Sequence, residues 1–332
     1  MTGDKEVLVQ LKDVKKEFVT SKTWTGKPLK VVHAVDQVNL SIYKGETIGV
    51  VGESGCGKST LGRCILRLLT PTSGDVVYRG ESIIRYNKEQ MRQMRRKMQL
   101  IFQDPYASLN PRMTVLELIR APLDAFGIGT GQERIQKVKK IMELVGMPEN
   151  MMNRYPHEFS GGQRQRIVIA RALVLDPEFV VCDEPVSALD VSVRAQVLNL
   201  IQELKKTKDL TYLFISHDLS VVKYVSDRIA VMYLGRVVEV AEKEELYRNP
   251  VHPYTSALLS AIPIPDVDNQ NKREILTGDV PSPLNPPSGC YFHTRCRHAT
   301  DQCRTRCPQL HDVGGGHLAA CHLCAGGEDR GR

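Results

Sequence analysis

Short apolar runs alternate with amphipathic segments along the chain. Residues 47–51 form a β-prone run, and Leu61, Ile65, Leu66 and Leu69 then recur at helical spacing. This pattern predicts a strand, a tight loop and a helix in direct succession. Further apolar strand-like runs occur later in the chain, so we expect an α/β fold.

A glycine-rich loop joins this strand to this helix. Its sequence, GESGCGKS, matches the pattern G-x-x-x-x-G-K-[ST]. Glycines let the backbone approach a phosphate with its N–H groups turned inward, and the following helix points its positive end at the same anion. We expect Lys58 to pair with the β- and γ-phosphates of ATP and Ser59 to ligate Mg²⁺. The predicted ATP contacts in the loop are Gly52, Ser54, Gly55, Cys56, Gly57, Lys58, Ser59 and Thr60.

A second apolar run, residues 179–182, ends in Asp183 and Glu184. The carboxyl ends of parallel strands lie at the edge where open α/β sheets bind ligands. We expect Asp183 to support Mg²⁺ and Glu184 to orient and deprotonate the water that attacks the γ-phosphate. Alone, the two acids would equally suit a helix start before Pro185, but a phosphate loop in the same chain favours the catalytic role.

Composition and charge narrow the class of protein only slightly. The 332 residues carry a net charge of +7, with 42% hydrophobic and 25% charged residues, as in ordinary folded proteins. No apolar run approaches the roughly 18–20 residues that cross a bilayer, and the first ten residues lack a signal-like segment. We therefore expect a cytosolic protein without stable disulfides. The basic run MRQMRRKM lacks interleaved aromatic residues, so we interpret it as a solvated helix face and expect no nucleic acid.

The stretch YPHEFSGGQRQRIVIARAL resembles the signature of the ATP-binding-cassette (ABC) ATPases. The resemblance covers about residues 6–260. It implies a P-loop NTPase (RecA-like) core with an N-terminal antiparallel β subdomain and a helical signature subdomain. It also implies that Ser160, Gly161, Gly162 and Gln163 cap ATP held by the P-loop of another chain, so that two chains enclose two nucleotides. Because this chain has one cassette, a second is expected as its partner.

The remaining family motifs follow in the family's order. Gln103, in LIFQDPYASLNP, resembles the Q-loop residue that contacts Mg²⁺ and water, and residues 187–190 (SALD) resemble the D-loop. His217, in LFISHD, resembles the switch histidine that contacts the γ-phosphate. Phe18 is the expected adenine-stacking residue, although a Phe ending an amphipathic strand equally suits a core. The implied catalytic residues are Glu184, His217 and Gln103, and the implied Mg²⁺ contacts are Ser59, Gln103 and Asp183.

Longer segments resemble one branch of this family, the ATPases of oligopeptide, dipeptide and nickel importers. They include QDPYASLNPRMTV and NPVHPYTSALLSAIP, and CGKSTLGR resembles the second of two paralogous subunits. The resemblance implies an ATPase that energises di- or oligopeptide import at the cytoplasmic face of the cell (inner) membrane. It implies three kinds of partner: a paralogous ATPase in a heterodimer, two transmembrane permease subunits docking near residues 103–113, and an extracytoplasmic solute-binding protein. The alternative is a soluble ABC ATPase that acts on nucleic acid through a zinc-binding tail.

The last quarter of the chain changes in composition. We place the ATPase domain at residues 1–250 and a small Cys-rich C-terminal extension at residues 251–332. Six prolines between residues 263 and 289 predict an extended linker, and six of the nine cysteines follow it. The other three cysteines, Cys56, Cys64 and Cys182, are expected to be small buried residues.

Clustered thiols in a reducing compartment favour metal binding, and two ligand sets compete. The importer tail pattern selects Cys290, Cys296, Cys303 and Cys321, for which the resemblance implies a 4Fe–4S cluster. Cys307 is an alternative ligand for that cluster. The set Cys303, Cys307, Cys321 and Cys324 is spaced more like a zinc site. Iron–sulfur is favoured over zinc and over no metal. We expect a structural staple rather than an electron carrier, because so short a tail buries little apolar surface.

Overall fold

The computed structural model describes residues 6–22, 28–261, 276 and 278–324. The chain folds into two compact units. The first contains Met1–Ile42, Ile48–Ile84 and Ser216–Arg332, and the second contains Tyr43–Thr47 and Arg85–Ile215. The phosphate loop and the C-terminal extension therefore share one unit, although residues 60–250 separate them in the sequence.

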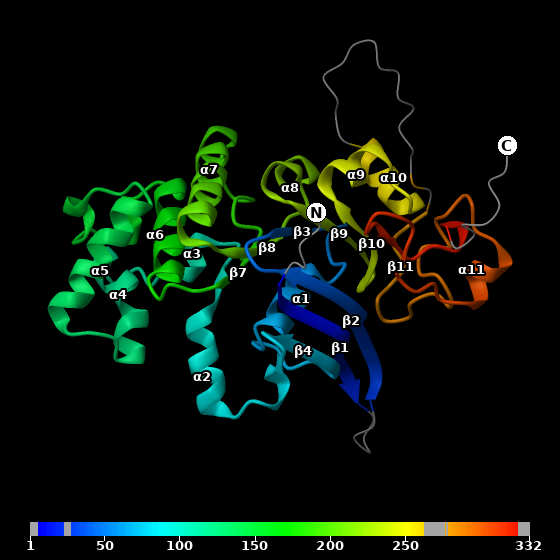
Figure 1. The fold of residues 1–332 in the computed structure, drawn as a ribbon, viewed down its shortest axis with the longest axis horizontal. Helices are drawn as coiled ribbons and strands as arrows, with labels where there is room; N and C mark the ends of the chain where they lie inside the picture. Colours follow the sequence, from blue (N-terminus) through cyan, green and yellow to red (C-terminus); the bar gives the residue numbers. More distant parts are fainter. Residues whose placement is uncertain (1–5, 23–27, 262–275, 277, 325–332) are drawn as a thin grey trace, which may run out of the picture. The chain divides into compact units, whose positions relative to one another are not determined.

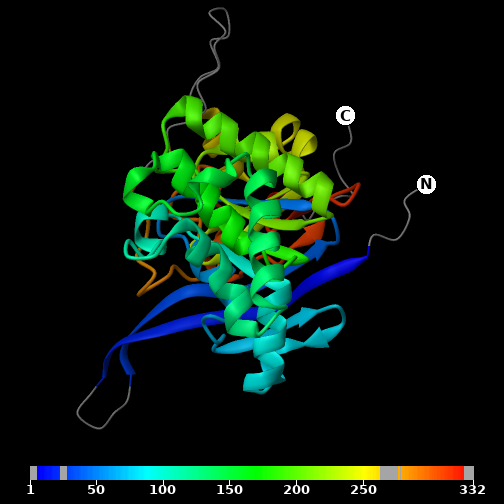
Figure 2. The same ribbon diagram turned by 90° about the vertical axis from the view of Figure 1, so that its left-hand side faces the viewer.

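The first unit contains an antiparallel sheet near the N-terminus. Its strand order is β2-β1-β4-β5, and the long strands β1 and β2 lie side by side in Figure 2. β1 pairs with β4 so that Val9 faces Tyr78, and a bulge between Lys12 and Lys15 shifts the register. The strands are β1 (Val7–Lys22), β2 (Pro28–Tyr43), β4 (Ser73–Tyr78) and β5 (Glu81–Ser82). The predicted antiparallel β subdomain is confirmed.

Further strands of the first unit follow the order β11-β12-β10-β9-β3. β3 and β9 are parallel, whereas β10 pairs antiparallel with β9 and with β12. The strands are β3 (Thr47–Val51), β9 (Arg228–Tyr233), β10 (Arg236–Glu242), β11 (His311–Asp312) and β12 (Leu318–Ala319). β3 has the predicted bounds and is fully buried. Because β11 and β12 come from the C-terminal extension, the extension adds strands beside β10 (Figure 1).

The helices of the first unit are short. They are α1 (Lys58–Ile65), α8 (Leu219–Val225), α9 (Lys243–Arg248), α10 (Pro253–Ser260) and α11 (Asp301–Thr305), with the 3-10 turns η1 (Ile83–Arg85) and η4 (His322–Cys324). α1 begins where predicted but ends before Leu69. Arg67 takes a left-handed φ of 47°, and the N–H groups of Leu68 and Leu69 both donate to the Arg63 carbonyl. This left-handed ending stops the helix although the apolar period continues.

The second unit combines parallel strands with a group of helices. β6 (Met98–Ile101), β7 (Phe179–Asp183) and β8 (Thr211–Ile215) pair in parallel in that order. The helices are α2 (Lys88–Lys97), α3 (Pro105–Ser108), α4 (Val115–Phe126), α5 (Gly131–Leu144), α6 (Gly161–Leu173) and α7 (Val191–Lys208), with the turns η2 (Glu149–Met151) and η3 (Pro156–Glu158). α4 packs on α5 and α6, the green helices of Figure 1. α4, α5 and α6 each begin with a capping box, which fixes their start locally.

Two segment predictions have mixed outcomes. The basic run MRQMRRKM begins on α2, where Met91 and Met94 are buried and the basic residues face outward, so the helix interpretation is confirmed. In the predicted linker, Pro263 and Pro265 lie outside the described residues, whereas residues 278–289 contain neither helix nor strand. The His33 N–H donates to the Pro283 carbonyl at 3.0 Å, so this part lies against β2. The domain boundary at residue 250 stays a prediction.

No helix in the described part of the chain combines the length and apolar character needed to cross a bilayer.

Candidate ATP site

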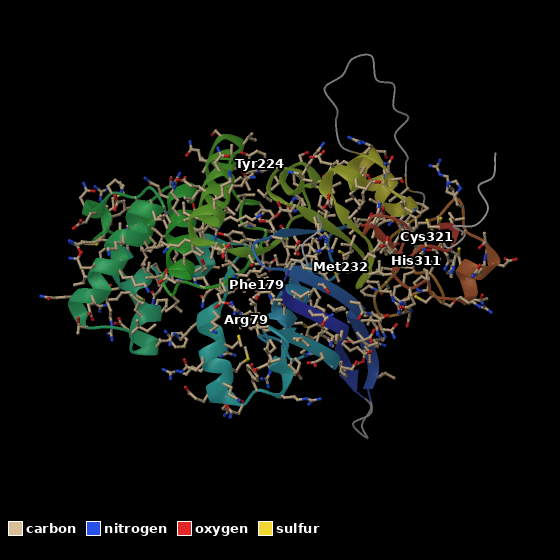
Figure 3. The ribbon with its side chains drawn as sticks, viewed as in Figure 1. Arg79, Phe179, Tyr224, Met232, His311 and Cys321 are labelled. Atoms are coloured by element: carbon tan, nitrogen blue, oxygen red, sulfur yellow. The ribbon has the colours of Figure 1, made fainter. Side chains whose placement is uncertain are left out.

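The phosphate loop lies between β3 and α1, as predicted. Close backbone contacts require two of its glycines. A Cβ atom at Gly52 would lie 2.1 Å from the carbonyl oxygen of Met232, a β9 residue labelled in Figure 3. A Cβ atom at Gly57 would lie 2.0 Å from the Ala34 carbonyl oxygen, and Gly57 has a left-handed φ of 101°. A side chain at either position would therefore displace the loop.

Lys58 is the first residue of α1, and its side chain turns back into the loop. Its ammonium donates to the carbonyl of Gly52 at 2.8 Å and to that of Glu53 at 3.0 Å. The N-terminal N–H groups of α1 lie at the same loop. Around this lysine, Ser54 and Gly55 are exposed and Ser59 and Thr60 are half-buried. The loop thus places the Lys58 ammonium and the first N–H groups of α1 together, where the triphosphate is predicted to bind.

In the second unit, an acid at the end of β7 contacts the predicted Q-loop residue. Asp183 is buried at the end of β7, and the next residue, Glu184, has a left-handed φ of 48°. The Gln103 amide donates to the Glu184 carboxylate at 3.0 Å, and the Ser187 hydroxyl donates to the Glu184 carbonyl at 3.0 Å. A left-handed backbone in a non-glycine residue costs about 1–2 kcal/mol, and such strain is concentrated at functional sites.

The signature residues form the exposed start of α6. The Ser160 hydroxyl accepts from the Gln163 N–H at 3.4 Å, and the Gln163 side chain accepts from the Ser160 N–H at 3.0 Å. A Cβ atom at Gly162 would lie 2.2 Å from the Val193 side chain, so glycine allows α6 to approach α7. Ser160 itself is exposed, which leaves this helix start accessible to another molecule. Backbone N–H groups at the start of a helix can bind a phosphate.

His217 and Phe18 both belong to the first unit. His217 is exposed just before α8, and Asp218 caps that helix by accepting from the Ser220 N–H at 2.9 Å. Phe18 is half-buried on β1, with the Lys16 ammonium 5.1 Å from its ring centre. The exposed part of the ring suits stacking, and the cation over it is a contact that the sequence did not predict.

The cysteines separate into buried core residues and a group in the extension. Cys56, Cys64 and Cys182 are buried, as expected, and burial raises the pKa of Cys64 to about 11. In the extension, burial raises the pKa of Cys290 to about 12, and the neighbouring thiols of Cys303, Cys321 and Cys296 add to the effect. The thiols of Cys303, Cys321 and Cys296 thus act electrostatically on Cys290, and Cys321 is labelled in Figure 3.

Cys307 faces a different environment from that group. Its thiol contacts the Arg236 guanidinium, which also pairs with Asp36. Cys324 lies next to Cys321 instead. Among residues 6–22, 28–261, 276 and 278–324, no set of three or more His, Cys, Asp or Glu side chains is placed to hold a metal ion.

Sequence reasoning missed a contact between the extension and the phosphate loop. Glu53, within GESGCGKS, forms an ion pair with Arg295 and donates its N–H to the Tyr254 hydroxyl. The HPY stretch and the FHTRC stretch were the available signals, because they contain Tyr254 and Arg295. Neither motif indicates by itself that its partner is residue 53.

A buried lysine in a glycine loop, an acidic strand end and a capped glycine helix start define a P-loop ATPase of the cassette type. Comparison with known proteins gives the same class. Residues 35–187 match the family described as ABC transporter, and residues 238–303 match the C-terminal region of oligopeptide/dipeptide transporters.

Similar proteins cover nearly the whole chain. A putative oligopeptide transport ATP-binding protein of Bacillus subtilis, YkfD, is 53% identical over 326 residues, covering 97% of both chains. The oligopeptide transport ATP-binding protein OppF of Escherichia coli is 50% identical, covering 93% of this chain and 94% of its own. The dimeric ATP-binding cassette MJ0796 bound to ADP and phosphate has a TM-score of 0.63 at 30% identity, covering 71% of this chain and 99% of its own. The chain therefore belongs to the ATP-binding proteins of ABC transporters.

Proposed function

We propose that this chain is the ATP-hydrolysing subunit of an ABC importer for di- or oligopeptides. The observation that carries the proposal is its likeness, at 50% identity or more over nearly its full length, to oligopeptide transport ATP-binding proteins. The match of residues 238–303 to the oligopeptide/dipeptide C-terminal region supports the same solute class. The alternative, a soluble ATPase acting on nucleic acid, gains no support from these relatives.

In the proposed mechanism, one half-site comprises Lys58, Ser59, Gln103, Asp183, Glu184 and His217. The loop N–H groups and Lys58 bind the β- and γ-phosphates, and Glu184 orients water for in-line attack on the γ-phosphate. The Gln103 amide fixes the Glu184 carboxylate by the hydrogen bond between them. His217 donates to the γ-phosphate, and Phe18 stacks on the adenine.

Mg²⁺ and the second chain complete the proposed site. The Ser59 hydroxyl, the Gln103 side-chain oxygen and the buried Asp183 carboxylate are the hard oxygen donors that Mg²⁺ prefers. Bound by these residues, the ion would neutralise negative charge on the nucleotide phosphates. Ser160, Gly161, Gly162 and Gln163 would cap the nucleotide of the facing chain, for which the exposed Ser160 end of α6 is suited.

The proposed partners follow from the importer type. They are a paralogous ATPase in a heterodimer, two permease subunits and an extracytoplasmic solute-binding protein, with this chain peripheral at the cytoplasmic membrane face. The permease would dock near residues 103–113. Tyr106, which lies there, is 62% exposed, and the Arg164 guanidinium stacks over its ring at 4.0 Å. An exposed but rigidly held aromatic residue suits a contact with another protein.

The proposal includes a 4Fe–4S cluster held by Cys290, Cys296, Cys303 and Cys321. Their thiol chemistry supports such a cluster, which takes four thiolate ligands, and so does the electrostatic effect of the other three thiols on Cys290. The zinc set fits less well, because the Cys307 thiol is engaged with Arg236. Bound there, the cluster would supply cross-linking that stabilises the extension. Anaerobic purification should give a brown protein with iron and sulfide in equal amounts, whereas a colourless zinc protein would contradict the cluster.

Reconstitution tests the transport function. The chain would be placed in proteoliposomes with its permease partners and a solute-binding protein, and uptake of a labelled tripeptide would be followed. Uptake should require ATP on the side of this chain and should vanish in Lys58→Ala. ATP hydrolysis that proceeds without any response to permease or peptide, together with retention on DNA at physiological salt, would favour the nucleic-acid alternative.

A further inference from the structure

The C-terminal extension reaches the phosphate loop through one arginine. Nη1 of Arg295 donates to Oε2 of Glu53 at 2.9 Å, and Nη2 donates to Oε1 at 3.1 Å. Two parallel hydrogen bonds between a guanidinium and a carboxylate form the strongest geometry for such a pair. Glu53 is the second residue of GESGCGKS, so the extension contacts the loop directly.

Aromatic side chains pack beside Arg295. The Phe292 ring lies 5.3 Å from that of Tyr233 and 5.4 Å from that of Tyr254, centre to centre, and the Arg295 guanidinium lies 6.0 Å from the Tyr233 ring centre. The Arg295 side chain is only 6% exposed, whereas that of Glu53 is 26% exposed. Removing either side chain of this ion pair would leave the other charge without its partner.

The backbone of Glu53 is held on both sides. Its N–H donates to the Tyr254 hydroxyl at 3.0 Å, and its carbonyl accepts from the Lys58 ammonium at 3.0 Å. Tyr254 belongs to α10 and is fully buried. Two segments of the extension therefore fix the residue whose carbonyl positions the lysine of the phosphate loop.

We propose that Arg295 is a positioning residue for ATP binding, which holds Glu53, and through it the phosphate loop and Lys58, in the shape that receives a triphosphate. This inference rests on the proposed function, because it takes the loop as the ATP site. Charge supplies a second contribution. Without Arg295, Glu53 would present an unpaired carboxylate beside a polyphosphate, and the two negative charges would repel each other.

Nucleotide affinity and turnover measured together test this role. Arg295→Met should raise both the Kd for MgATP, measured by calorimetry, and the KM of the ATPase roughly five- to tenfold, with little change in kcat. Arg295→Lys keeps the charge without the fork and should give a smaller rise. Adding Glu53→Gln to Arg295→Met should lower the Kd again, because the repelling carboxylate is gone. If the contact served only to stabilise the fold, replacing Glu53 as well as Arg295 would not restore the Kd for MgATP.

Two further variants separate the possible failures. Arg304→Met is the matched control, since Arg304 lies on the same extension with a side chain 66% exposed, and its Kd should equal that of the wild type. Lys58→Ala tests the ATP site itself and should abolish ATP binding. Wild-type ATP binding in Lys58→Ala would refute the proposed function. If Lys58→Ala loses ATP binding while Arg295→Met and Arg295→Lys keep the wild-type Kd, the role of Arg295 is refuted but the proposed function is not. If Arg295→Met fails to fold, Arg295→Lys still tests the role.

Discussion

The Gln103 side-chain amide donates a 3.0 Å hydrogen bond to the Glu184 carboxylate, across 81 residues of sequence. One residue follows strand β6 and the other follows strand β7, which pair in parallel. Neighbouring parallel strands place both at the same sheet edge. The bond therefore holds the proposed general base in one orientation.

Replacement of Glu184 tests that base. Glu184→Gln removes the group that accepts the water proton but keeps the size and hydrogen-bonding shape of the side chain. ATP hydrolysis should fall about 10²- to 10⁴-fold while ATP binding persists, and the closed dimer should accumulate. Phosphate release and size-exclusion chromatography in ATP measure the two effects. Glu203→Gln, an exposed change on α7, is the control. Parental turnover in Glu184→Gln would assign the base to another group.

Replacement of Gln103 tests the orienting bond. Gln103→Ala frees the Glu184 carboxylate, so kcat should fall about ten- to a hundredfold, because misplacement of a reacting group is costly. In a Glu184→Gln background, the same change should have little further effect on hydrolysis, since no base remains to orient. Additive losses in the double variant would indicate that Gln103 acts independently of Glu184.

Local features of the site could be predicted from the sequence, because each is written in consecutive residues. The bounds of β3, the start of α1 and the acids at the end of β7 follow from short apolar runs and a glycine pattern. The early end of α1 could not, since the apolar period continues through Leu69 while the backbone turns left-handed at Arg67.

Side-chain pairs that are far apart in the sequence could not be predicted from it. Glu53 and Arg295 are 242 residues apart, and neither lies in a periodic pattern that would name the other. The same holds for Glu239 of β10, a fully buried carboxylate that accepts from the His317 ring at 2.7 Å. Both pairs join the extension to the rest of the first unit, so the sequence predicts that an extension exists but not which residues it contacts.

Replacement of His317 tests one of these attachments. Glu239 also accepts from the N–H groups of Val251 and His252, at 2.7 and 3.0 Å, so His317→Ala leaves the carboxylate with two of its three partners. A lost hydrogen bond to a charged group should lower the free energy of unfolding by about 2 kcal/mol. Urea unfolding measures it, with the exposed His298→Ala as control. Equal effects of the two changes would show that the buried bond contributes nothing specific.

The buried side chain of His252 should make the free energy of unfolding depend on pH. Burial lowers its pKa to about 4, and the nearby Glu239 carboxylate only partly offsets this. In the unfolded chain the imidazole takes a proton below its ordinary pKa of about 6.5, whereas in the folded chain it stays neutral. The unfolded state thus binds more protons, so stability should be complete above pH 6.5 and fall by about 2 kcal/mol between pH 7.5 and pH 5.

A His252→Asn variant separates the contribution of His252 to this pH dependence from that of other titrating groups. His252→Asn keeps a side-chain oxygen that can cap α10, as the His252 ring does by accepting from the Tyr254 N–H, but it does not titrate. Urea unfolding at both pH values should show a drop in the wild type that is about 2 kcal/mol larger than in His252→Asn. Parallel losses in the two proteins would assign the pH dependence elsewhere.

Removal of the proposed cluster should weaken ATP binding, because Arg295 directly precedes Cys296 in the chain. Without metal, the segment that contains Cys290 and Cys296 loses its cross-link, and the guanidinium is less well placed to hold Glu53. Protein stripped of iron by a chelator and an oxidant, then reduced, should show a higher Kd for MgATP than the loaded protein. In Arg295→Met the same treatment should change the Kd little, since the contact it acts through is already absent. A stripped protein that binds ATP as tightly as the loaded one would confine the cluster to stabilising the extension.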